Sequence, residues 1–364
     1  MTGDGQRRTR QRALGALFGL AIGDALGMPT QSLPRPAIVA RYGPLLSSFE
    51  PGPRDHPLAA GLPAGTVTDD TQQALLLAGL VADGAGEVDQ AELGTRLLAW
   101  EDTMRARGSL DLLGPSTRRA LAAVAAGASP GEAGRYGTTN GAAMRITPVG
   151  IATPATDMNL LVGRVVTASK LTHNTSVALA GAAAVAAAVS ARLSGAAMPA
   201  AAEAAAGAAA AAAVRGHWAA GADVAARIRW ATRLAVGLDE EELMDTVYRL
   251  VGTSLATQES VPAAFAVAAF SPDDPWRACR MAASLGGDCD TIAAITGAIC
   301  GAGTGAGAFP AAARATVTAV NRLDLEPLAG RLLTVRAAPA LTSAPAPPSA
   351  PAGPGGPGDG GGPR

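Results

Sequence analysis

The sequence contains very little lysine, cysteine or histidine. Lys170 is the only lysine among 29 basic residues, and three histidines and three cysteines are spread over 364 residues. Cys279, Cys289 and Cys300 are too few and too unevenly spaced for a disulfide framework or a cysteine-based zinc site. Three scattered histidines also exclude a histidine-rich metal centre. A reduced, cytoplasmic setting fits this composition best.

Excess charge of one sign is also missing. The formal net charge is −1 and the isoelectric point is about 6.3, which argues against a general nucleic-acid binder. Arg7-Arg8 and the apolar run at positions 14–22 resemble an export signal, but Asp24 follows at once and no small-residue cleavage site does. We therefore expect a protein that is not exported and has no nucleic-acid partner.

Long uninterrupted apolar runs are scarce as well. The alanine-rich tract at positions 178–214 is interrupted by Arg192, Pro199 and Glu203, so no segment is predicted to span a membrane. Alanine has the highest intrinsic helix propensity, so the same tract predicts helix. We expect no membrane partner.

The pattern of apolar residues predicts an all-α protein. Runs of valine, isoleucine and aromatic residues bounded by hairpin turns are missing, which argues against a substantial sheet. Apolar residues instead recur at the i, i+3, i+4 spacing of helices. The predicted helices cover residues 72–82, 91–105, 117–126, 160–171, 177–192, 224–236, 240–251, 275–284 and 291–300.

Composition divides the chain into three parts. Residues 1–10 are polar and are expected to be flexible, and residues 11–337 read as one domain without a repeat of fixed period. Residues 338–364 consist mainly of Ala, Pro, Ser and Gly. Such a tail has too little apolar bulk to offset the entropy of ordering, so it is predicted to be disordered.

Two short acidic clusters lie far apart in the chain. One is Thr68-Asp69-Asp70-Thr71 and the other is Gly286-Gly287-Asp288-Cys289-Asp290-Thr291, and each leads into a predicted helix. Either cluster alone is explained by helix capping, which favours Thr and Asp at a helix start. The shared pattern favours a metal site, because carboxylate and hydroxyl oxygens suit Mg²⁺ or Mn²⁺. If the fold brings the clusters together, they form a site for two divalent ions that activate water.

The segment before the first cluster has small residues at every fourth position. Gly15, Gly19, Gly23 and Gly27 fall on one face of a predicted helix, on which another helix can pack closely. Asp24 on such a buried helix needs a polar partner, which predicts a structural or supporting role. Gln31 follows the helix end, where a loop could present it to a pocket.

A third stretch, residues 137–150, follows neither a helix nor a strand period. Its small residues expose backbone N–H groups that can hold phosphate or ribose oxygens. Arg145 could bind a phosphate or a carboxylate, or it could be buried and paired with an aspartate. His173 precedes a helix, and a lone histidine is more often structural than catalytic.

Five motifs in this order resemble the ADP-ribosylglycohydrolase family. The resemblance runs from about Ala13 to Leu333. The family includes the ADP-ribosyl-arginine and ADP-ribosyl-serine hydrolases. It implies a compact, orthogonal multi-helix bundle with a binuclear Mg²⁺ or Mn²⁺ centre at the mouth of a cleft. The motifs are Gly23-Asp24-Ala25-Leu26-Gly27-Met28-Pro29, Thr68-Asp69-Asp70-Thr71, Asn140-Gly141-Ala142-Ala143-Met144-Arg145, Thr172-His173 and Gly286-Gly287-Asp288-Cys289-Asp290-Thr291.

The resemblance also implies roles for individual residues. The metal ligands would be Thr68, Asp69, Asp70, Asp288, Asp290 and Thr291. The substrate would be bound by Asn140, Gly141, Ala142, Ala143, Met144, Arg145, His173, Gly286 and Gly287. The catalytic groups would come from Asp69, Asp70, Asp111 and Gln31.

Gln31 departs from the family pattern, in which a glutamate occupies this position. Glutamine cannot accept a proton, so the general base would be Asp69, Asp70 or Asp111. We expect a hydrolase that uses two Mg²⁺ or Mn²⁺ ions and cleaves a glycosidic bond at ribose C1 of ADP-ribosylated protein or small ADP-ribosyl compounds. The alternatives are a hydrolase of nucleoside-like N-ribosides and a non-catalytic ADP-ribose-binding protein weakened by Gln31. A monomer is compatible with the sequence.

Overall fold

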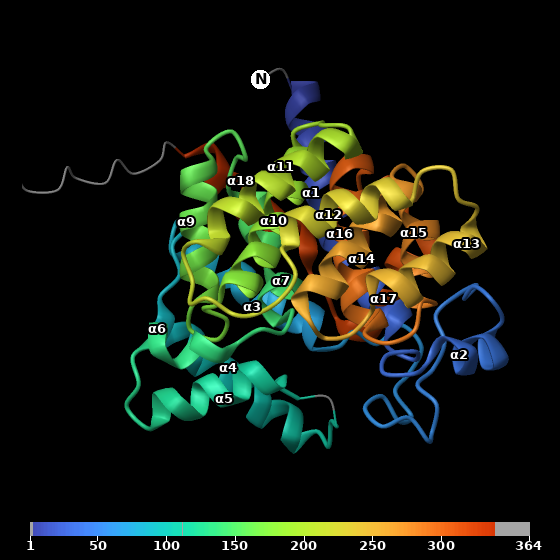
Figure 1. Cartoon of the computed structure of the whole chain (residues 1–364), viewed down its shortest axis with the longest axis horizontal. Helices are drawn as coiled ribbons and strands as arrows, with labels where there is room; N and C mark the ends of the chain where they lie inside the picture. Colours follow the sequence, from blue (N-terminus) through green and yellow to red (C-terminus); the bar gives the residue numbers. More distant parts are fainter. Residues whose placement is uncertain (1–2, 111, 339–364) are drawn as a thin grey trace, which may run out of the picture.

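The computed structural model describes residues 3–110 and 112–338, and most of these are folded into helices (Figure 1). Within these two ranges no β-strand occurs, and only isolated bridges such as Leu33 with Gly287 are formed, so the all-α prediction is confirmed. The α-helices are α1 (Gly3–Gly27), α2 (Arg35–Tyr42), α3 (Asp69–Asp83), α4 (Gln90–Ala106), α5 (Pro115–Ala125), α6 (Pro130–Ala133), α7 (Gly141–Arg145), α8 (Thr147–Ala152), α9 (Met158–Ser169), α10 (Ser176–Leu193), α11 (Met198–Ala213), α12 (Val224–Leu234), α13 (Glu240–Thr246), α14 (Thr257–Phe270), α15 (Pro275–Ala283), α16 (Cys289–Thr304), α17 (Ala311–Asn321) and α18 (Leu325–Ala337). Short segments η1 (Gly134–Tyr136), η2 (Val247–Val251) and η3 (Ala306–Ala308) complete the set.

Helices α1 and α16 form the central pair of the bundle. A Cβ added to Gly19 would stand 2.0 Å from the carbonyl oxygen of Gly297, and one added to Gly23 would stand 2.0 Å from that of Ala293. Only glycine allows two helix backbones to approach this closely. The predicted close packing along the glycine face is therefore confirmed, and it brings the end of α1 beside the start of α16.

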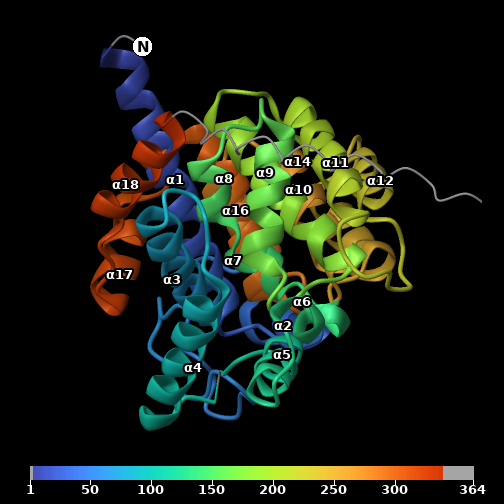
Figure 2. The same ribbon diagram turned by 90° about the vertical axis from the view of Figure 1, so that its left-hand side faces the viewer.

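Helix α10 is surrounded by other helices and packs against α9, α11 and α14 (Figure 2). By length and composition alone, this helix could cross a membrane. The prediction that no segment has the length and composition of a membrane span is therefore wrong. The difference arises because Pro199 and Glu203 fall in the following helix α11, which leaves α10 almost uninterrupted. Since 94% of the apolar window is buried inside the protein, α10 is explained as a core helix.

The start of the chain differs from its prediction. Residues 3–10 form the first turns of α1 instead of a flexible segment. Arg10 contributes to this order, since its guanidinium lies 3.0 Å from the carboxylate of Glu326 on α18. The predicted disordered tail lies outside the described residues, apart from position 338.

Each of the nine predicted helical segments contains helix in the structure, with two informative differences. The predicted segment 240–251 ends as the π-helix η2 rather than as continuous α-helix. Helices α3 and α16 begin earlier than expected, at Asp69 and Cys289. Both acidic clusters therefore lie at helix starts.

Candidate functional site

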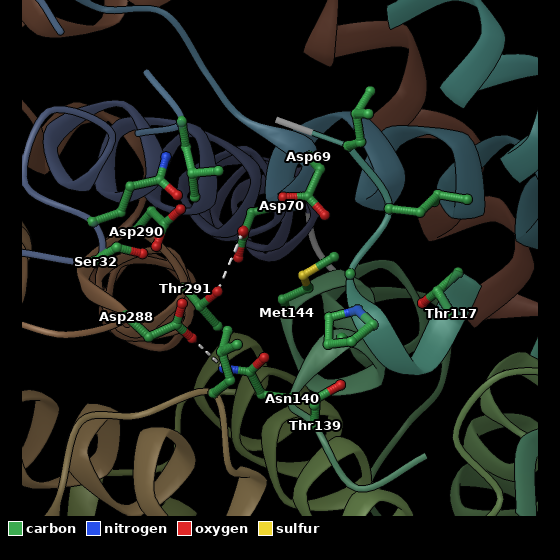
Figure 3. Close-up of a pocket in the computed structure, with 18 of the residues that line it drawn as sticks. Ser32, Asp69, Asp70, Thr117, Thr139, Asn140, Met144, Asp288, Asp290 and Thr291 are labelled. Carbon is green, nitrogen blue, oxygen red and sulfur yellow. Dashed lines mark hydrogen bonds between the residues drawn. The ribbon is translucent and has the colours of Figure 1, made fainter. Parts of the chain in front are cut away.

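The two acidic clusters meet at one cavity of about 240 Å³ (Figure 3). Asp69 and Asp70 reach it from the first turn of α3, and Asp288, Asp290 and Thr291 reach it from the start of α16. The hydroxyl of Thr291 donates to Oδ2 of Asp70 across 3.3 Å, which joins the clusters directly. The central prediction from the sequence, that these distant segments are neighbours, is confirmed.

Asp24 on α1 fixes the position of the first acidic cluster through hydrogen bonds. Its buried carboxylate accepts hydrogen bonds from the backbone N–H groups and hydroxyls of Thr68 and Thr71. Burial raises the pKa of Asp24 to about 6, and these hydrogen bonds oppose the shift. The partner that Asp24 was expected to need is thus the N-terminus of α3. Thr68, a predicted metal ligand, points its hydroxyl at Asp24 and does not line the cavity.

Asp70 is a buried carboxylate surrounded by other negative charges. Its side chain is 1% exposed, and within the described part of the chain its Oδ1 has no hydrogen-bond partner. Burial raises the pKa of Asp70 well above its ordinary value, and the negative charges of Asp69, Asp24 and Asp288 raise it further. Several carboxylates gathered in this way have the charge and the oxygen donors that a divalent cation requires.

Amide side chains hold the other carboxylates in this conformation. Asn140 donates to Asp288, and Gln73 donates to Oδ2 of Asp69 across 2.7 Å. Burial raises the pKa of Asp288 to about 6, and the bond from Asn140 opposes the shift. Among the residues that the structure describes, no three acidic, histidine or cysteine side chains already stand in a ligating arrangement. A cation would therefore have to draw the carboxylates together and replace amide donors, although the all-oxygen donor set suits Mg²⁺ or Mn²⁺.

The segment from Asn140 to Arg145 consists of the short helix α7 and its N-cap residue Asn140, and it only partly faces the cavity. Asn140, Gly141 and Met144 line it, in agreement with their predicted role. Ala142 and Ala143 are buried and are not among the lining residues, so the structure gives them no contact with a ligand there.

Arg145 also lies behind the cavity wall. It is fully buried and donates to the side-chain oxygens of Gln73 and Thr172, at 3.2 and 2.6 Å. Burial lowers the pKa of Arg145 to about 10, and the charge of Asp69 opposes this shift. The buried alternative describes this residue better than direct contact with a phosphate, although its partners are an amide and a hydroxyl rather than a carboxylate.

His173 likewise supports the wall from behind. Its Nε2 lies 3.0 Å from the hydroxyl of Thr139, which does line the cavity, and its Nδ1 lies 2.8 Å from that of Thr172. Burial lowers the pKa of His173 well below its ordinary value, and the charge of Arg145 lowers it further. His173 is therefore neutral and positions Thr139, and it does not reach the cavity itself.

Gly286 and Gly287 shape the backbone next to the cavity. Both have left-handed backbone angles, with φ of 94° and 78°. Gly287 exchanges backbone hydrogen bonds with Ser32 and Leu33, at 2.7 and 2.9 Å. The glycines thus fix the segment after α1 next to the cavity, and neither is among the cavity-lining residues.

Gln31 lines the cavity with a side chain that is only 4% exposed. Its backbone is fixed on both sides, since its N–H donates to Gly27 at 2.9 Å and its carbonyl oxygen lies 2.8 Å from Nε2 of His56. Its amide Nε2 has no hydrogen-bond partner within the described residues. Asp111, the remaining catalytic candidate, lies outside the described residues.

Sequence reasoning missed part of the cavity wall. A leucine or threonine that lines a pocket has the same local pattern as one in a core, so no signal marked these residues. Gly114-Pro115 is a typical start of a helix, and a helix was predicted just after it, but nothing marked its first turn as part of a cavity. The missed residues are Ser32, Leu58, Leu110, Leu112, Leu113, Gly114, Pro115, Thr117, Arg118 and Leu255, whereas Thr139 lies in the stretch 137–150 that was singled out.

Comparison with known proteins extends these observations. The family described as ADP-ribosylglycohydrolase matches residues 5–341. The uncharacterized protein YegU of Escherichia coli (strain K12) is 36% identical over 327 residues, which cover 90% of this chain and 97% of YegU. An uncharacterized protein of Archaeoglobus fulgidus is 31% identical over 286 residues, which cover 79% of this chain and 85% of that protein.

Two further similarities concern proteins whose names state an activity or a family. The ADP-ribosyl-[dinitrogen reductase] glycohydrolase of Rhodospirillum rubrum is 32% identical over 174 residues, which cover 45% of this chain and 51% of that enzyme. A solved structure named ADP-ribosylglycohydrolase-related protein complex superposes with a TM-score of 0.64 at 27% identity, and covers 90% of this chain and 99% of that one.

Proposed function

The chain belongs to the ADP-ribosylglycohydrolase family and is a glycosyl hydrolase of that type, and from this premise we propose that it uses divalent cations to hydrolyse the bond at C1 of a ribosyl substrate. The observation that carries the proposal is the contact between Thr291 and Asp70, because it joins both acidic clusters in one cavity. ADP-ribosyl compounds are the substrates that family membership favours.

The cation site would be formed by Asp69, Asp70, Asp288, Asp290 and Thr291, which all line the cavity. Their oxygens suit two Mg²⁺ or Mn²⁺ ions. When bound, such ions lower the pKa of water so that a nucleophile exists near neutral pH.

The chain's own residues would then direct the reaction. Asn140 and Gly141 face the same cavity as the carboxylates and can orient the sugar. A carboxylate of the first cluster, Asp69 or Asp70, accepts the proton of the attacking water, because the amide of Gln31 has no basic atom. The water oxygen forms a bond to C1, and the bond to the leaving group breaks with its electron pair on the leaving atom, through an oxocarbenium-like transition state.

The experiment that tests this function separates cation binding from catalysis. Chelator-treated protein is titrated with Mn²⁺ and Mg²⁺ in a calorimeter, alongside Asp290→Asn and the control Asp102→Asn, an exposed position on α4. At a cation concentration of about 100 times Kd, we expect wild type to gain about 2.7 kcal/mol of stability. Asp290→Asn should lose this gain and Asp102→Asn should keep it.

Activity is measured on the same samples with ADP-ribosyl-arginine, ADP-ribosyl-serine, ADP-ribose esters and simple nucleosides. We expect release of a ribose species only when a divalent cation is present. Hydrolysis at full rate after chelation would refute the metal-dependent reaction. Tight binding of ADP-ribose without turnover over hours would identify a binding protein instead.

We also infer that the protein acts as a cytoplasmic monomer with no nucleic-acid or membrane partner. The net charge of only −1 supports the lack of a nucleic-acid partner. Light scattering of the purified protein tests the monomeric state.

A further inference from the structure

The cavity has two chemically different sides. In Figure 3, Asp288 and Asp290 lie on one side and Thr117 on the other, with Met144 between them. Apolar side chains form much of the wall between the polar groups, and no aromatic or lysine side chain is among the described residues that line the cavity. The apolar wall is formed by Leu58, Leu112, Leu113, Pro115, Met144 and Leu255.

This cavity offers little positive charge to a ligand. Among its described lining residues Arg118 is the one cationic side chain, and its guanidinium already donates to the carbonyl oxygen of Leu113 at 2.9 Å and lies 3.8 Å from the carboxylate of Glu101. A diphosphate in this cavity would therefore have to rely mainly on backbone N–H groups rather than on side-chain cations of the described lining residues.

The size of the cavity points in the same direction. Its volume of about 240 Å³ is below the range of about 300–1,000 Å³ that is typical for drug-sized ligands. A ribose with one ring system suits such a space better than a dinucleotide-like molecule does.

Gln31 supplies a specific polar contact. Its Nε2 is buried at the cavity and has no partner within the described chain, although buried donors in proteins are nearly always satisfied. The fixed backbone of Gln31 holds this donor ready for a ligand atom that accepts a hydrogen bond. An amide recognises a neutral acceptor such as a hydroxyl, carbonyl or ring nitrogen.

We infer, on the basis of the proposed function, that the substrate is an uncharged N-riboside of the nucleoside class, in which ribose C1 carries a nitrogen of a neutral unsaturated ring. The sugar faces the carboxylates, the ring lies against Leu113, Met144 and Leu255, and Gln31 donates to an acceptor of the substrate. The oxygen of water bonds to C1 and the C1–N bond breaks. Its electron pair stays on the ring nitrogen, which takes up the proton from the water, so no oxidant or reductant is needed.

The substrate class is tested on the intact chain with Mn²⁺. Adenosine, inosine and uridine are compared with their 5′-monophosphates, ADP-ribosyl-arginine and ADP-ribosyl-serine, and the released base or side chain is quantified by chromatography. We expect kcat/KM to be at least ten times higher for a nucleoside than for any phosphorylated compound. Equal or faster hydrolysis of ADP-ribosyl compounds would overturn this inference and support the proposed function. Hydrolysis of none of them would contradict both.

Two variants test the recognition elements. Gln31→Met keeps the side-chain length but removes the donor, and should raise KM for the nucleoside about tenfold while Mn²⁺ affinity is unchanged. Leu255→Ser at the cavity mouth should also raise KM, whereas Leu98→Ser on α4 should not, since these leucines are similarly exposed (48% and 46%) and Leu98 does not line the cavity. An unchanged KM in Gln31→Met or Leu255→Ser would refute that residue's part in recognition.

Discussion

Replacing Gly23 by alanine should force α1 and α16 apart and weaken the whole bundle. The new Cβ would stand 2.0 Å from the carbonyl oxygen of Ala293 and 2.8 Å from the backbone nitrogen of Ala294. Close C···O contacts in proteins are about 3.3–3.6 Å, so the helices must separate by roughly 1.3 Å. Both obstructing atoms belong to a helix backbone, and no change of side-chain rotamer can relieve the clash.

The magnitude follows from two opposing effects. Overpacking of a tight core costs about 1–3 kcal/mol, and alanine returns up to about 1 kcal/mol of helix propensity relative to glycine. Separation at Gly23 also loosens the contact at Gly19, which is equally close to Gly297. The upper end of the cost therefore applies, with a net loss of about 2 kcal/mol and a Tm lower by about 3 °C.

Calorimetric and urea unfolding would measure this change, with Gly207→Ala as the matched control. Gly207 lies on the exposed face of α11, and nothing stands within 4 Å of an added Cβ there. The control should be as stable as wild type or gain up to about 1 kcal/mol. Mn²⁺ affinity should fall in Gly23→Ala only, because Asp24 and Asp290 lie on the two separated helices. If Gly23→Ala unfolds at the wild-type temperature, the close-packing argument is refuted.

Two other predictions concern groups beneath the cavity. Because the pKa of His173 is depressed in the folded state, its contribution to stability is full above about pH 6.5 and is lost as pH falls towards that depressed value. Between pH 7.5 and 5.5 the wild type should lose about 1.4 kcal/mol more than His173→Gln, as measured by urea titration at both pH values; parallel losses would contradict the assignment. Asp24→Asn removes one of two acceptor oxygens beneath Thr68 and Thr71 and should lower the free energy of unfolding by about 3 kcal/mol, whereas Asp102→Asn should not change it. Equal stability of these two variants would show that Asp24 does not hold the start of α3.

The helices and the meeting of the acidic clusters could be predicted from local sequence. Helix periodicity and glycine spacing are short-range signals, and the face made by Gly15 and Gly23 did identify a close helix contact. Paired aspartates beside a threonine, repeated in two places, indicated one shared site. The helix and glycine-face predictions depend on patterns that one segment displays by itself, whereas the shared site was inferred from one pattern found in two segments.

The orientation of single side chains could not be predicted in the same way. Arg145 and His173 belong to the right segments, but Arg145 on α7 donates to Gln73 and Thr172, and His173, between α9 and α10, contacts Thr139 and Thr172 from behind the wall. A five-residue helix has inner and outer faces that only its neighbours define. The apolar wall around Leu113 escaped notice for the same reason, since burial in a core and exposure to a pocket demand the same residue type.

The order in which the site's parts leave the ribosome follows from their places in the chain. Asp69 and Asp70 are synthesised well before Asp288, Asp290 and Thr291. A nascent chain therefore carries only half of the carboxylates through most of translation. The proposed cation site is complete only once α16 has docked against α1, so a chain that stops before α16 would lack the second cluster.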